Sequence, residues 1–76
     1  MRAMKADPVA LLARHLEKHK KSQSDLAKQA GIAEAHVSRY LARLRRPDME
    51  NAIRLERATG GEVPALAWAF SQRKAS

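Results

Sequence analysis

The chain contains no cysteine, which excludes two ways of stabilising a small protein. Neither a disulfide framework nor a metal site built on thiolates is available to it. The absence fits a reducing compartment. At 76 residues the chain has room for one domain only, so we treat residues 1–76 as a single unit near the size at which one core suffices for folding.

Aromatic residues are scarce, with only Tyr40, Trp68 and Phe70 in the whole chain. So few large side chains predict a thin core. A small domain with a thin core offers little to hold a catalytic constellation rigidly, so an enzyme is the least expected class. Binding of single-stranded nucleic acid by base stacking is also disfavoured, because the core or a dimer contact accounts for these three residues.

Acidic residues are few: eight Asp and Glu stand against fifteen Lys and Arg, a net charge of +7. Such a chain is expected to meet a polyanion. Long apolar runs are missing too, so neither a membrane span nor a signal peptide is supported, and we expect a soluble, cytoplasmic protein with no membrane partner. A cationic membrane peptide would form one long amphipathic helix, whereas this sequence breaks into short ones.

Helical spacing and capping residues predict five helices and no strands. Asp7-Pro8 starts the first, Ser22 with Asp25 forms a capping box at the second, and Asp48 can cap the fourth. Gly31 ends the second helix in a left-handed turn. In the third helix, Val37, Tyr40, Leu41 and Leu44 form one apolar stripe. The predicted helices lie near residues 8–20, 23–30, 34–45, 48–59 and 64–72.

Two short helices joined through Gly31 have the layout of a helix-turn-helix, in which the second helix enters the major groove of DNA. The outward face of the third predicted helix carries no acid between Ala35 and Arg46. Arginines on that face can therefore meet phosphates and base edges without repulsion. We expect an all-helical protein that binds double-stranded DNA.

The stretch SQSDLAKQAGIAEAHVSRYL resembles the helix-turn-helix of the phage Cro and repressor group, and RRPDMENAIRLERATGGEVPALAWAF resembles that group's closing helices. The resemblance covers residues 9–70. It implies a compact five-helix, lambda-repressor-like domain that binds a palindromic operator as a homodimer and represses transcription, with no cofactor. Where the family usually has Ser or Thr, this chain has Ala33, so its third helix lacks a side-chain cap.

The resemblance also assigns roles to individual residues. It implies that Gln23 contacts a phosphate and that Ser38 and Arg43 lie over the backbone. The base-reading positions would be Glu34, Ala35, His36 and Arg39. With Ser22, Arg45 and Arg46 as further backbone contacts, the predicted DNA-binding set is Ser22, Gln23, Glu34, Ala35, His36, Ser38, Arg39, Arg43, Arg45 and Arg46.

Chemistry favours Arg39 for base reading, because a guanidinium can grip guanine O6 and N7 in bidentate fashion. Ala35 can offer its methyl group to thymine. Glu34 can accept from a cytosine amino group, hold Arg39, or favour the start of the helix by its charge. A solvated basic face is the simpler explanation of such arginines, and capping alone would explain Ser22 and Gln23.

His15 and His19 lie one helical turn apart and share a face of the first predicted helix. The zinc-protease pattern requires Glu directly after the first His, whereas Glu17 points away from the pair. Two ligands do not make a metal site, and we predict none.

The segment Leu66 to Phe70 is apolar all round, more than a surface helix requires. It either closes the core or leaves part of Leu66, Trp68 and Phe70 exposed as a dimer interface. The closest functional alternative is the antitoxin of a toxin-antitoxin pair, with a toxin as second partner. An RNA-binding module and a plain protein-interaction bundle are weaker alternatives.

Overall fold

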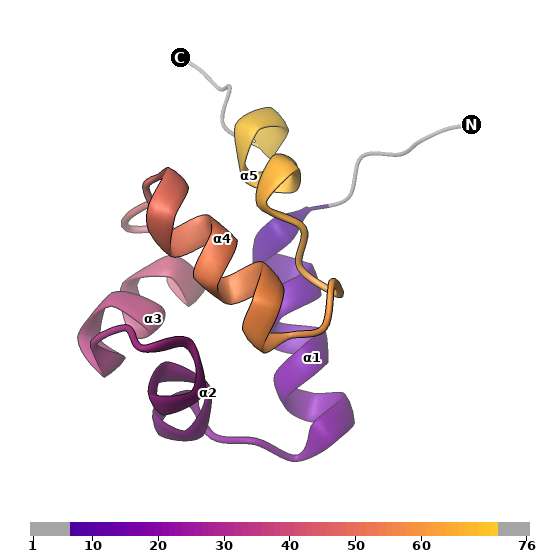
Figure 1. Ribbon diagram of the computed structural model, residues 1–76, viewed down its shortest axis with the longest axis vertical. Coiled ribbons are helices and arrows are strands. Elements are labelled where there is room, and N and C mark those ends of the chain that lie inside the picture. Colours follow the sequence, from indigo (N-terminus) through magenta and orange to yellow (C-terminus); the bar gives the residue numbers. More distant parts are fainter. Residues whose placement is uncertain (1–6, 72–76) are drawn as a thin grey trace.

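A computed structural model describes residues 7–71, with side chains described through residue 69. The helices of this part are α1 (Pro8–His19), α2 (Gln23–Ala30), α3 (Glu34–Leu41), α4 (Met49–Ala58) and α5 (Ala65–Ser71) (Figure 1). The described residues contain no strand, which confirms the predicted all-α, five-helix fold class. None of these helices combines the length and apolar character that crossing a membrane requires.

Polar side chains begin three of the helices as their sequence predicts. The Asp7 carboxylate accepts a hydrogen bond from the Val9 amide at 3.1 Å and so caps α1. At α2 the Ser22 hydroxyl accepts from the Asp25 amide at 3.0 Å, and the Asp25 carboxylate accepts from the Ser22 amide at 3.2 Å. This reciprocal pair is the predicted capping box. Asp48 caps α4 by accepting from the Asn51 amide at 2.9 Å.

Gly31 makes the turn between α2 and α3. Its φ of 74° lies in the left-handed region, where a Cβ atom would be strained. The amides of Gly31 and Ile32 both donate to the Ala27 carbonyl, at 2.8 and 2.9 Å, and close the end of α2. The chain then enters α3 within three residues, as the glycine predicts.

The third helix is shorter than predicted: it ends at Leu41, not at residue 45. Arg43 takes a left-handed φ of 62°, and its amide donates to the Tyr40 carbonyl at 3.1 Å. The Leu44 amide turns back to the Arg39 carbonyl at 2.9 Å. The apolar stripe is corrected accordingly, because Leu44 lies past the helix end and is 76% exposed. The sequence concealed this end because the left-handed position is usually glycine.

The helices pack around one core in which α4 occupies the centre (Figure 1). It contacts α2 on one side and α5 on the other, while α1 contacts α3 and α5. The largest fully buried side chains include Tyr40, Leu12, Leu26, Leu55, Val37 and Val63. Because α3 supplies Val37 and Tyr40 to this core, its opposite face is left toward solvent.

Candidate nucleic-acid interface

The solvent face of α3 carries most of the predicted base-reading residues. Glu34, Ala35, Ser38 and Arg39 are all exposed. At 100° per residue they fall within about 140° of the helix circumference, so they share one face. His36 lies at the edge of this face and is half-buried. Its ring stacks on Tyr40 with a centroid separation of 6.3 Å.

The buried face of α3 is fixed by Tyr40, which is 1% exposed. Its hydroxyl accepts a hydrogen bond from the Asn51 side-chain amide of α4 at 3.1 Å. Its ring lies 6.0 Å from that of Trp68 in α5, centroid to centroid. One residue thus ties α3 to two other helices. That anchoring holds the exposed face in a set orientation.

Arg39 presents its guanidinium to solvent. Within residues 7–69 this guanidinium makes no hydrogen bond or ion pair, and the same holds for the Glu34 carboxylate. The suggestion that Glu34 holds Arg39 therefore has no contact to support it in this part of the chain. An arginine on a rigid helix without a local partner is available to an external anion or base edge.

The start of α3 has no side-chain cap, as Ala33 predicts. The Ala33 carbonyl accepts the first hydrogen bonds of the helix, from the amides of His36 at 3.0 Å and Val37 at 3.3 Å. Because Ala33 has no polar side chain, the amides before His36 have no side-chain acceptor at the cap. Free amides at a helix start, with the positive end of the helix dipole, favour a phosphate.

Arg43 is engaged by a residue far away in the sequence. Its guanidinium donates to both carboxylate oxygens of Asp7, at 2.6 and 3.4 Å. The Arg43 hydrogen bond, against a smaller opposing effect of burial, lowers the pKa of Asp7, and Asp7 in turn raises the pKa of Arg43. Arg45 and Arg46 follow on the exposed connection before α4.

The predicted contacts on α2 lie at its start. Ser22 is exposed and caps the helix, while Gln23 is its first residue and is half-buried. The hydrogen bonds that Ser22 and Asp25 exchange lower the pKa of Asp25. The helix that begins here packs directly on α3.

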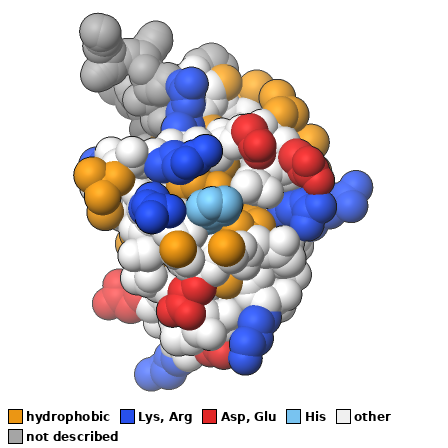
Figure 2. All heavy atoms as spheres, turned by 90° about the vertical axis from the view of Figure 1, so that its left-hand side faces the viewer, with side chains coloured by type: hydrophobic (Ala, Val, Ile, Leu, Met, Phe, Trp, Pro, Cys, Tyr) orange, Lys and Arg blue, Asp and Glu red, His pale blue; other side chains and the backbone are white. Residues whose placement is uncertain are grey.

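Figure 2 shows the left-hand side of the molecule in Figure 1, the side on which α3 lies. Lys and Arg side chains gather above and to the left of one histidine. Acidic side chains lie to its upper right and below it, so they bound this basic area. The basic area above and to the left of the histidine is the part of this side that suits a polyanion.

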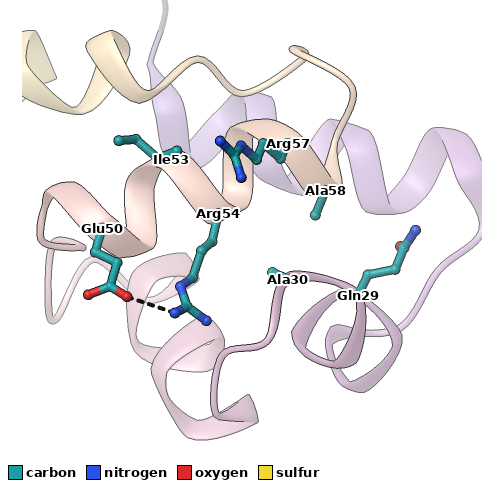
Figure 3. Close-up of a pocket in the computed structure, with 7 residues that line it drawn as sticks. All are labelled: Gln29, Ala30, Glu50, Ile53, Arg54, Arg57 and Ala58. Carbon is teal, nitrogen blue, oxygen red and sulfur yellow. Dashed lines mark hydrogen bonds and ion pairs between the residues drawn. The ribbon is translucent and has the colours of Figure 1, made fainter.

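Sequence reasoning missed Arg54, which braces the helix turn from α4. Its guanidinium donates to the Gly31 carbonyl at 3.1 Å and to the Glu50 carboxylate at 2.7 Å (Figure 3). The spacing of four residues between Glu50 and Arg54 was a usable signal for their ion pair. Nothing in the sequence indicated the contact with Gly31. Glu50 and Arg54 line an open groove of about 620 Å³ between α2 and α4, together with Gln29, Ala30, Ile53, Arg57 and Ala58.

The residues predicted to form a dimer interface differ in how exposed their side chains are. Leu66 is 66% exposed on α5, whereas Trp68 is 4% exposed and belongs to the core. Trp68 therefore supports α5 from inside rather than presenting a surface. The side chain of Phe70 lies outside the described residues.

Comparison with known proteins agrees with this geometry. A family model described as helix-turn-helix matches residues 12–66, well over half of the chain. No curated protein and no solved structure matched the chain. The matched stretch runs from inside α1 to the second residue of α5 and contains the α2–α3 turn. The chain belongs to the Cro/C1-type helix-turn-helix family and is a DNA-binding transcriptional regulator.

Proposed function

We propose that the protein is a repressor that binds a palindromic operator as a homodimer, with α3 of each protomer in the major groove. The observation that carries the proposal is the exposed face of α3, with the Arg39 guanidinium unengaged in the described chain and the helix start uncapped. An α-helix fits the major groove, where each base pair shows a distinct pattern of donors and acceptors.

In this arrangement α3 reads the bases. Arg39 donates to guanine O6 and N7, a contact that contributes about 1–3 kcal/mol of discrimination. Ala35 meets a thymine methyl group, and Glu34 accepts from a cytosine amino group. His36 lies at the edge of this contact, and its ring packs on Tyr40.

Other residues position the helix on the sugar-phosphate backbone. Contacts of this kind set orientation and carry no sequence information. We assign them to the start of α2, to Ser38 and to the arginines that follow α3. The residues are Ser22, Gln23, Ser38, Arg43, Arg45 and Arg46. Because Lys and Arg release counterions from DNA, affinity is expected to fall steeply with salt.

The dimer contact is placed on α5 and the adjoining face of α4. Leu66 is 66% exposed, and on α4 Met49 and Ile53 are 70% and 39% exposed. The two helices that carry these apolar side chains pack on each other. Pairing of that surface with a second copy would bury them and create a two-fold axis. Trp68 would stabilise the interface indirectly by holding α5.

Selection of bound duplexes from a random pool tests the proposal. The expected result is a palindrome whose half-sites lie one DNA turn apart, about 34–36 Å centre to centre. A promoter carrying the selected site should lose reporter output when the protein is expressed. Enrichment of no sequence would contradict specific binding, and enrichment of an isolated half-site would contradict the dimer. The antitoxin alternative uses the same DNA interface, so the selection tests its DNA step as well.

A further inference from the structure

Two histidines of α1 and one glutamate from the α4–α5 connection come together in the fold. His15 Nδ1 lies 2.8 Å from one Glu62 carboxylate oxygen, and His19 Nε2 lies 3.3 Å from the other. The two imidazole rings are 4.4 Å apart, centroid to centroid. One potential ligand atom from each of the three residues lies within 4.8 Å of the other two.

The fold creates this meeting from distant parts of the sequence. His15 and His19 share a face of α1 because they are four residues apart. Glu62 is 47 residues from His15 in the sequence, and it arrives because the α4–α5 connection runs beside α1 (Figure 1). The turn at Gly60 and Gly61 takes φ of 64° and 90°, and the Glu62 amide donates to the Thr59 carbonyl at 3.2 Å. The fold thus adds Glu62 as a third candidate ligand, which the spacing of residues along the sequence did not indicate.

We propose that His15, His19 and Glu62 form a binding site for a divalent transition metal ion of the Zn²⁺ class. Two imidazole nitrogens and one carboxylate oxygen are a donor set that such ions accept, with water in a fourth position. Ligands at about 2.1 Å around a tetrahedral ion stand about 3.4 Å apart. The two nitrogen-to-oxygen separations run to different Glu62 oxygens, 2.8 Å from His15 and 3.3 Å from His19. Both are close to that edge, so small movements of the rings and the carboxylate admit an ion.

The charge of the site suits a cation despite one competitor. Glu62 supplies a carboxylate, the form of the side chain that binds metal. Its two oxygens face His15 Nδ1 and His19 Nε2, and a bound ion would take the place of these two hydrogen bonds. The Lys18 ammonium lies 3.2 Å from the same carboxylate. Because the Lys18 side chain is 62% exposed, it can move into water when an ion enters.

The fold holds His15 in place with one ring nitrogen toward the carboxylate. It is 3% exposed, and Nδ1 is the atom that faces Glu62. Coordination through Nδ1 requires that the ring proton sit on Nε2, which is buried with no hydrogen-bond partner among the described residues. A bound ion would thus take the place of the Glu62 hydrogen bond at Nδ1 and leave the surroundings of Nε2 unchanged.

Titration of the full chain, without a histidine tag, with Zn²⁺ in a calorimeter tests the site. We expect binding of one ion per chain and a melting temperature that rises with Zn²⁺ concentration, because an ion bound only by the folded state stabilises it. His19→Gln and Glu62→Gln should each weaken the affinity at least tenfold. These two side chains are only partly buried, so both variants should fold, which the circular dichroism spectrum checks.

Two further variants on α1 sharpen the test. Glu17→Gln removes an exposed carboxylate outside the cluster and should leave Zn²⁺ affinity unchanged. Lys18→Ala removes the competing ammonium and should raise the affinity. Absence of one-to-one binding by the wild-type chain at millimolar Zn²⁺ would overturn the proposal. Equal affinity in the wild type and in folded His19→Gln and Glu62→Gln would overturn it too.

Discussion

Asp7 and Arg43 join the residue that caps α1 to the turn that ends α3. The Asp7 carboxylate accepts from the Val9 amide at 3.1 Å while also receiving the Arg43 guanidinium at 2.6 Å. One acid therefore fixes the start of one helix and the end of another. Because Arg43 lies in the turn that ends α3, the pair also limits how α3 can tilt against α1.

The ion pair between Asp7 and Arg43 should make the melting temperature depend on pH in the acidic range. Asn at position 7 keeps a capping oxygen but loses the charge, so Asp7→Asn should lower the melting temperature at pH 7 by about 2–4 °C, the range for an exposed pair. The pKa of Asp7 is lowered in the folded state, so its contribution is present above the ordinary value near 3.8 and lost as pH falls through the folded pKa. The melting temperatures of the two proteins should therefore approach each other as the pH falls below 3.8. A difference that grows as the pH falls would contradict this account.

The hydrogen bond from Asn51 to Tyr40 should stabilise the seat of α3. Tyr40→Phe removes the acceptor and keeps the ring between His36 and Trp68, so the expected loss is about 1 kcal/mol in the free energy of unfolding. Urea unfolding measures it. In a double-mutant cycle, Asn51→Ala should lower the free energy of unfolding by less in the Tyr40→Phe background than in the wild type, because the shared hydrogen bond is already gone. Fully additive losses would show that the bond contributes nothing.

Gly31 and Gly60 form a matched pair for testing the turn between α2 and α3. Both have left-handed φ, 74° at Gly31 and 64° at Gly60. A Cβ atom added at Gly31 would lie 3.1 Å from Arg54 Nη1, whereas a Cβ atom added at Gly60 would have no atom within 4 Å. Gly60→Ala should cost about 1 kcal/mol from conformation alone. Gly31→Ala should cost more, since Arg54 must also move from the Gly31 carbonyl. Equal losses by urea unfolding would remove Arg54 from the explanation of this turn.

Much of the fold was accessible from local sequence because its signals are local. Ser22 with Asp25, Gly31, and Asp48 each act on amides or torsions within a few residues, so their patterns predicted helix boundaries. The end of α3 was missed because Arg43 occupies a left-handed position that its residue type rarely takes, and because its partner Asp7 is 36 residues away. Leu44 was misplaced on the apolar stripe for the same reason.

The candidate site also has a part that local sequence predicts and a part that depends on how the helices pack. Helical periodicity places Glu34, Ala35, Ser38 and Arg39 on one face once Val37 and Tyr40 are known to be buried. The supports of that face come from elsewhere: Asn51 and Arg54 from α4 and Trp68 from α5. Such contacts depend on how the helices pack, which residue spacing does not encode. The burial of Trp68 and the exposure of Leu66 also required the assembled core.

Leu66 should control the oligomeric state. Leu66→Glu places a charge on the exposed side of α5, so it should leave the melting temperature of the monomer within about 2 °C while disfavouring the dimer. Sedimentation of the wild type should give a dimer, and that of the variant a monomer with weaker binding to a two-half-site operator. Trp68→Ala is the contrasting change, because it should cost about 3–5 kcal/mol of folding stability. A Leu66→Glu protein that sediments as the wild type would place the interface elsewhere.

Dimethyl sulfate footprinting on the selected operator tests the central claim most directly, because the reagent methylates guanine N7 in the major groove. With α3 in that groove, the wild-type protein should protect guanines in each half-site. Arg39→Ala should restore methylation at one guanine per half-site and narrow the gap between specific and random duplexes by about 1–3 kcal/mol. Unchanged protection and unchanged specificity in folded Arg39→Ala would contradict the placement of this face against the bases.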